Sequence, residues 1–379
     1  MKSSPVWIPP WALVGGQLAH GLSWLLLAWL GWERLLGPSL PGLAWVHLVA
    51  LGWLTLIALA VLVHVFKGVL DVTWRGEAIA RWALLPFALG TAGMVASFWA
   101  GALQPLAWAA SLVGAGLVGY LVPAAATLAS FRASEDASPA VARAFALVLV
   151  MLALAAKLGL GMAWGLASGS FPTLLAVGPA VHAHLGGVGW LTLLVMGVSV
   201  RTVRRISGSG PTQPWLHIGA STAVLAGLAG LTLGLGLGLP LVSGVGGAAC
   251  ALGACLNLVD LALRLKAGSE PHLPPQAFIG ASAVYFVGAA VAGLMAWAGH
   301  PGWQAAYVFL GLMGWLGQMV NGHMLHIGIR VLATVARGDD DETEPIDILA
   351  PWLSWGSWAA AQLAVVGVTA GLVWNQGAW

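Results

Sequence analysis

The sequence predicts an all-α polytopic membrane protein, because of its composition, the length of its apolar stretches and the placement of its charges. Of the 379 residues, 59% are hydrophobic and only 7% are charged. A water-soluble domain carries roughly 25% charged residues. We therefore expect the lipid bilayer to be both the solvent and the main partner of this chain, and we expect no nucleic-acid partner.

Eleven apolar stretches are long enough to cross a membrane, which takes about 20 residues of helix. They lie between clusters of Gly, Pro and charge, which mark the loops. The first stretch has Glu33 and Arg34 at its far end and no small-residue cleavage site, so we expect it to be the first span and not a signal peptide. The predicted spans are residues 11–36, 42–67, 79–103, 106–131, 140–168, 173–200, 215–237, 240–266, 275–298, 303–335 and 350–376.

The basic residues indicate the orientation of the chain in the membrane. Most of the 15 basic residues lie at the N-terminus or on the side where even-numbered spans end, whereas Arg34 lies on the other side. Cytoplasmic loops carry an excess of Lys and Arg. The sequence thus predicts a multi-pass protein of a bacterial-type inner membrane, with its N-terminus in the cytoplasm.

A short passage recurs in the second, sixth and tenth predicted spans. Residues 47–56 read HLVALGWLTL and residues 184–193 read HLGGVGWLTL. The third copy keeps Leu310 and the Gly-Trp-Leu of residues 314–316, with Phe309 in place of the histidine. Because these spans are four apart, we expect one membrane domain, residues 1–379, in a pseudo-threefold arrangement of four-helix repeats whose last member is one helix short. The predicted repeats are residues 11–132, 140–266 and 275–376.

Apart from His217, which is near the end of one span, seven histidines fall inside the predicted spans, where a polar side chain is costly unless it has a partner. On a regular helix, the seventeen residues from His47 to His64 amount to about 25 Å, too far for the two to share one metal ion. We therefore expect an outer and an inner layer of histidines. The outer layer holds His47, His182 and His184, and the inner layer holds His64, His323 and His326, with His20 at a similar depth.

Two pairs of neighbouring histidines differ in what they can do. His182 and His184 point about 200° apart on a regular helix, so they face different neighbours, and one of them can be a secondary partner of a ligand. His323 and His326 are three residues apart and share a face, so one can bind a ligand while the other orients it.

Haem b is the cofactor that suits this pattern, because its iron accepts one imidazole nitrogen from each of two helices and its ring needs apolar walls. Neutral imidazole also brings no charge into the membrane. His64 with His326 is our first ligand pair, and His47 with His184 is the second. A copper or zinc site made by His47, His182 and His184 is the rival use of these residues.

Other polar residues inside the spans have simpler interpretations. Lys157 marks a proton or substrate path, or it donates to backbone carbonyls or to a cofactor carboxylate. Asp260 and Arg264 are four residues apart and predict an ion pair on one helix face. The acidic run of residues 339–344 predicts a solvated loop.

The repeated four-helix units, with histidines on helices two, six and ten, resemble the catalytic subunit I of the haem–copper oxidase superfamily. They also resemble its distant NnrS-type relatives, which are haem- and copper-containing membrane proteins linked to nitric oxide stress. In that superfamily helices two and ten hold the low-spin haem, and helix ten also holds the active-site haem. The resemblance implies that His47 or His64 is a haem ligand on helix two, that His323 or His326 is one on helix ten, and that His184 is a metal ligand on helix six.

The sequence also departs from the pattern of that superfamily. Helix seven has no paired histidines, helix ten reads His-Met-Leu-His, the twelfth helix is absent, and Phe309 stands where a histidine is expected. We therefore do not expect a complete oxygen-reducing centre.

The leading hypothesis is a membrane-embedded b-type haem protein, with or without copper, in electron transfer or in the handling of nitric oxide or dioxygen. An oxidoreductase activity of the haem–copper type is compatible with it, and a quinol or a cytochrome is the expected electron donor. The alternative is a transporter or sensor of copper or zinc, in which Met319 or Met324 extends a relay of the intramembrane histidines.

Overall fold

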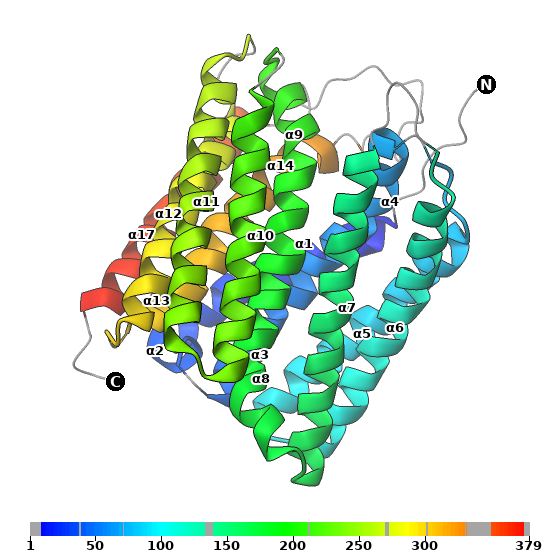
Figure 1. Ribbon diagram of the computed structural model, residues 1–379, viewed down its shortest axis with the longest axis vertical. Coiled ribbons are helices and arrows are strands. Elements are labelled where there is room, and N and C mark those ends of the chain that lie inside the picture. Colours follow the sequence, from blue (N-terminus) through cyan, green and yellow to red (C-terminus); the bar gives the residue numbers. More distant parts are fainter. Residues whose placement is uncertain are drawn as a thin grey trace. The chain divides into compact units, whose positions relative to one another are not determined.

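The computed structural model describes residues 9–37, 39–70, 72–132, 139–210, 213–269, 273–300, 302–329, 331 and 350–374, and the elements in these ranges are helices (Figure 1). Ten of the described helical segments are long and apolar enough to cross a membrane. The prediction of an all-helical, multi-pass membrane protein is confirmed at this level. The acidic run of residues 339–344 lies outside the described residues.

Prolines set many of the helix starts, which is why the predicted spans begin within about three residues of the observed helices. Two predicted ends are wrong, since α1 ends at Leu30 and not at residue 36, and α9 continues to Ser207 and does not end at residue 200. Proline suits the first turn of a helix, since its fixed φ is already helical and its missing N–H is not needed there. A proline is the first residue of helices α1, α7, α8, α10, α11, α12 and α17. The elements are α1 (Pro10–Leu30), α2 (Trp32–Leu35), α3 (Leu40–His47), η1 (Leu48–Thr55), α4 (Leu56–Leu70), α5 (Glu77–Ala100), α6 (Leu103–Ala129), α7 (Pro139–Ser168), α8 (Pro172–His184), η2 (Leu185–Thr192), α9 (Leu193–Ser207), α10 (Pro214–Leu237), α11 (Pro240–Lys266), α12 (Pro274–Trp297), α13 (Trp303–Phe309), η3 (Leu310–Leu316), α14 (Gly317–His323), η4 (Met324–Gly328) and α17 (Pro351–Trp374).

The chain forms two compact units. The first holds residues 1–197 and 235–238, and the second holds residues 198–234 and 239–379. In the first unit α6 packs against α5 and α7, and α7 packs against α8 and η2. In the second unit α12 is central, because α11, α13, η3, α14 and α17 all pack on it. The predicted division into three repeats stays a prediction.

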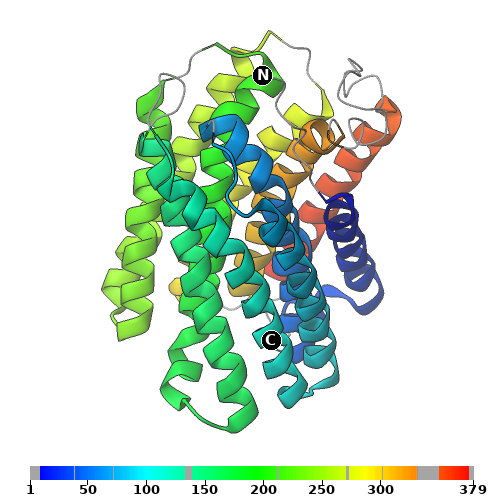
Figure 2. The same ribbon diagram turned by 90° about the vertical axis from the view of Figure 1, so that its right-hand side faces the viewer.

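Glycines bring α5 and α6 of the first unit into backbone contact, and the two helices lie side by side in both views (Figures 1 and 2). A Cβ at Gly90 of α5 would lie 2.6 Å from the amide nitrogen of Val113. A Cβ at Gly116 of α6 would lie 2.6 Å from the amide nitrogen of Phe87. Close approach through small residues is how membrane helices gain van der Waals contact, since lipid supplies no hydrophobic drive between them.

A buried ion pair ties two helices of the second unit together. Arg264 lies 3.0 Å from the carboxylate of Asp260, and both side chains are almost completely buried. The guanidinium also donates to the carbonyl oxygen of Val200 on α9, at 3.1 Å. The predicted pair is confirmed, and it is enclosed by protein, where the loss of one partner would leave an uncompensated charge.

We predict that Gly116→Ala destabilises the protein by about 1–3 kcal/mol, because the new methyl group must push apart two backbones that are in contact. Thermal unfolding of the detergent-solubilised protein measures this change. Gly21→Ala is the matched control, since a Cβ there meets nothing within 4 Å. Equal unfolding temperatures of the two variants would contradict the close packing of α5 on α6.

Candidate functional site

Each copy of the repeated passage contains a π-helical segment at the same register. A π-helix closes its hydrogen-bonded turns one residue later than an α-helix, and such segments are rare and frequent at functional sites. The repeat was recognised from side chains alone, and the shared backbone deviation supports it independently. The segments are η1 directly after His47, η2 directly after His184 and η3 directly after Phe309.

Side chains of the first two copies meet in the first unit. Trp53, Trp190 and Trp315 share one position in the repeat, and all three are buried. The indole N–H of Trp190 donates to the hydroxyl of Thr55 at 3.1 Å. The repeated passages of the second and sixth predicted spans are therefore in direct contact, and they place the histidines that precede them in one region.

Two histidines from different helices lie next to each other in this region. The rings of His47, at the end of α3, and His182, near the end of α8, have centroids 6.3 Å apart and planes 18° from parallel. A metal–nitrogen bond is about 2.0 Å long and an imidazole centre lies about 1.2 Å from its nitrogen, so two imidazoles on opposite sides of one ion have centres about 6.4 Å apart. The observed separation therefore matches that of two ligands of one metal.

The other nitrogen of each ring is held by a main-chain carbonyl. The Nδ1 of His47 donates to the carbonyl oxygen of Leu43 at 2.8 Å, and the Nδ1 of His182 donates to that of Ala155 on α7 at 2.9 Å. A carbonyl oxygen can only accept, so the proton sits on Nδ1 and the lone pair on Nε2. This arrangement fixes the tautomer and the ring direction that a ligating histidine needs.

Gly159 makes the position of the His182 ring possible. A Cβ at Gly159 would lie 2.9 Å from the Cε1 of His182, so any larger residue would have to displace the ring. Ala155 and Gly159 are one turn apart on α7. The carbonyl of Ala155 accepts the hydrogen bond of His182, and the missing side chain of Gly159 leaves room for its ring. Sequence reasoning missed both residues, because a small residue in a membrane helix gives no sign of what lies beside it.

The structure does not assemble the predicted site of three histidines. Within the described ranges, no group of three or more His, Cys, Asp or Glu side chains is placed to hold a metal ion. His184 bonds through its Nδ1 to the carbonyl of Ala180 on its own helix, at 2.7 Å, whereas His182 reaches across to α7. The two side chains have different partners because they project from different sides of α8.

His20 has a packing role in the first unit. Its ring stacks on Trp53 with centroids 3.7 Å apart, and its Nε2 accepts the indole N–H of Trp24 at 2.9 Å. An indole nitrogen can only donate, so the Nε2 lone pair of His20 is already used. The metal-binding role expected of His20 therefore requires its other nitrogen or a broken hydrogen bond.

His323 is hydrogen-bonded at both nitrogens within the second unit. Its Nδ1 donates to the carbonyl of Met319 at 2.8 Å, and its Nε2 lies 2.6 Å from the hydroxyl of Thr202. Met319 itself is buried, with its sulfur near the hydroxyls of Ser199 and Ser282. These contacts make His323 a residue that ties α14 to α9, and they occupy the nitrogen that would bind a metal.

The remaining predicted residues lie elsewhere in the two units. His64 is exposed on α4 of the first unit, and His326 is half-buried in η4 of the second. The pairing of His64 with His326 joins the two units and stays a prediction. Lys157 lies on an exposed face of α7, so its side chain does not line the interior of the first unit.

We predict that Thr202→Val destabilises the protein by about 1–3 kcal/mol, because it leaves the Nε2 of half-buried His323 without its hydrogen bond. A double-mutant cycle with His323→Phe, followed by thermal unfolding, measures the coupling. Since the second substitution removes the nitrogen, Thr202→Val should cost much less in the His323→Phe background. Simple additivity of the two effects would contradict this contact.

No family model matches the chain, and no curated protein sequence matches it. The interpretation of the site therefore depends on the geometry of the residues themselves.

Proposed function

We propose that the protein is a membrane-embedded b-type haem protein that transfers electrons, and that His47 and His182 would hold the haem iron. The separation of their rings carries this proposal, because it equals the separation expected across one metal ion. Both imidazoles are neutral in the proposed tautomer, so they add no charge to a region enclosed by apolar helices.

The surroundings of the two rings suit a flat apolar cofactor. Phe98 lies beside His47 with ring centroids 5.1 Å apart, and Gly159 lets the ring of His182 pack directly on α7. When bound, haem would supply a reversible one-electron couple, and its potential would depend on the ligands and on burial. The chain itself holds the ring directions through the carbonyls of Leu43 and Ala155.

If His47 and His182 both held the iron, the haem would supply electron transfer and would have no open position for a gas molecule at this site. Handling of nitric oxide or dioxygen would require a second metal with an open position. His64 or His326 would be its ligand, and copper would be a further metal of such a site. A quinol or a cytochrome is the electron donor that this proposal implies.

A copper transporter or sensor is the second candidate, favoured by the same two imidazoles. Imidazole is a good ligand for copper as well as for haem iron. Met319 and Met324 belong to the second unit, and in this candidate they would bind the copper ion after the histidines release it. This candidate predicts bound copper without haem.

We predict that the protein purified in mild detergent shows a Soret band and a positive pyridine haemochrome test, and that His47→Ala and His182→Ala each abolish both. Loss of an axial ligand removes one of the two bonds that hold the iron. His300→Ala is the control, since His300 is exposed beyond the end of α12. Wild-type protein with copper by elemental analysis but no haem would support the second candidate, and protein with neither would overturn both.

We predict that Gly159→Ala weakens cofactor binding by about 10-fold or more, because it displaces His182 from the carbonyl that orients it. Titration of the cofactor into the protein, followed by absorption, measures the affinity. Gly21→Ala is the matched control on α1, where a new methyl group has open space. Unchanged affinity in Gly159→Ala, with the fold intact, would exclude His182 as a ligand.

A further inference from the structure

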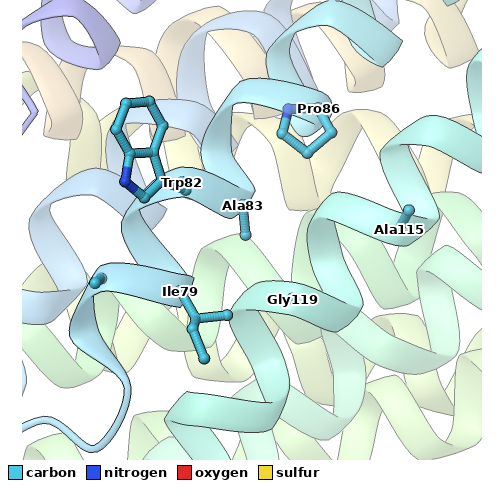
Figure 3. Close-up of a pocket in the computed structure, with 7 residues that line it drawn as sticks. Ile79, Trp82, Ala83, Pro86, Ala115 and Gly119 are labelled. Carbon is cyan, nitrogen blue, oxygen red and sulfur yellow. The ribbon is translucent and has the colours of Figure 1, made fainter.

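A groove lies open on the surface of the first unit, between α5 and α6 (Figure 3). Its volume is about 480 Å³, within the range of roughly 300–1,000 Å³ that small-molecule sites have. None of the candidate histidines lines it. The residues around it include Ile79, Trp82, Ala83 and Pro86 of α5, with Ala115 and Gly119 of α6.

Small residues form the floor of this groove and large apolar side chains form its walls. A Cβ at Gly119 would lie 2.9 Å from the Cβ of Ala83, so the two helices almost touch there. Trp82 and Ile79 stand above this floor, and they are 69% and 61% exposed. Apart from the indole N–H of Trp82, the lining offers no polar side chain, so its occupant must be apolar.

An exposed arginine, Arg75, lies four residues before Ile79, which lines the groove. The amide of Arg75 donates to the hydroxyl of Thr127 at 2.9 Å, which fixes this segment on the last turn of α6. Gly76 follows Arg75, and a Cβ built at Gly76 would lie 3.5 Å from the Cβ of Pro123 on α6. Helix α5 begins at the next residue, and its first turns line the groove. Arg75 and Arg132 are both exposed at this end of α5 and α6, which the charge distribution predicts to face the cytoplasm.

We propose that this groove binds one acyl chain of an anionic phospholipid, whose headgroup phosphate contacts Arg75. An acyl chain needs an apolar channel with no hydrogen-bonding groups, which the lining supplies. A guanidinium binds phosphate through two parallel N–H donors. Trp82 lies in the second turn of α5, close to the predicted start of this span, and tryptophan suits the region where headgroup and chain meet. A quinone ring would need hydrogen-bond partners that the lining lacks.

The test is native mass spectrometry of the purified protein with phosphatidylglycerol and with phosphatidylcholine of the same acyl chains. We expect preferential retention of phosphatidylglycerol. Ala115→Leu, whose new side chain fills the groove from an exposed position, should weaken retention of both lipids by about ten-fold or more, since each displaced methylene group contributes about four-fold. Arg75→Gln should weaken only phosphatidylglycerol, by about five-fold.

Matched controls separate the groove from general effects of the substitutions. Ala126→Leu places the same side chain on an exposed position of α6 outside the lining, and Arg132→Gln removes a neighbouring charge. Ala78→Leu fills the groove from α5 and replaces Ala115→Leu if that variant fails to fold. Unchanged lipid retention in the filled variants overturns the proposal. Equal retention of the two lipids, or displacement of both by an added quinone, also overturns it.

Discussion

The bilayer imposes one constraint on which the rest of this structure depends, namely that polar groups must find their partners inside the protein. Four of the histidines meet it in the same way, through a main-chain carbonyl that accepts from Nδ1. His47, His182, His184 and His323 all do so. What distinguishes them is their surroundings, because Thr202 contacts the Nε2 of His323, whereas the rings of His47 and His182 lie next to each other. The same local solution thus serves packing in one unit and a candidate ligand pair in the other.

Much of the architecture could be predicted from the sequence, because the proline and glycine positions that delimit the predicted spans also delimit many of the observed helices. The spans, the pairing of Asp260 with Arg264 and the register of the repeat all follow from local patterns. The choice of His182 beside His47 could not be predicted, since it depends on α7 supplying the carbonyl of Ala155 and the space at Gly159. Those residues are ordinary alanine and glycine positions in an apolar helix, and no local pattern distinguishes them.

The π-helical segments could not be predicted either, although their positions coincide with the repeat. The sequence-based predictions assumed regular α-helices, in which each residue turns the chain by about 100° and the angle between any two side chains is known. In the structure the backbone departs from that geometry directly after His47, His184 and Phe309. The third copy has Phe309 for histidine and Gly317 for the threonine found at Thr55 and Thr192, so it keeps the backbone feature while losing two of the polar side chains.

The π-helical segment η1 lets this helix hold an additional residue without changing the rotational phase of its two halves. A π-helical turn contains about one residue more than an α-helical turn, so deleting one residue from Leu48–Thr55 and restoring regular winding would leave α4 facing nearly the same way. His47 and His64 would then keep their directions, whereas the same deletion in a regular α-helix would turn the far half by about 100°. Such a segment can therefore absorb a single-residue insertion or deletion while both ends of a transmembrane helix stay in place.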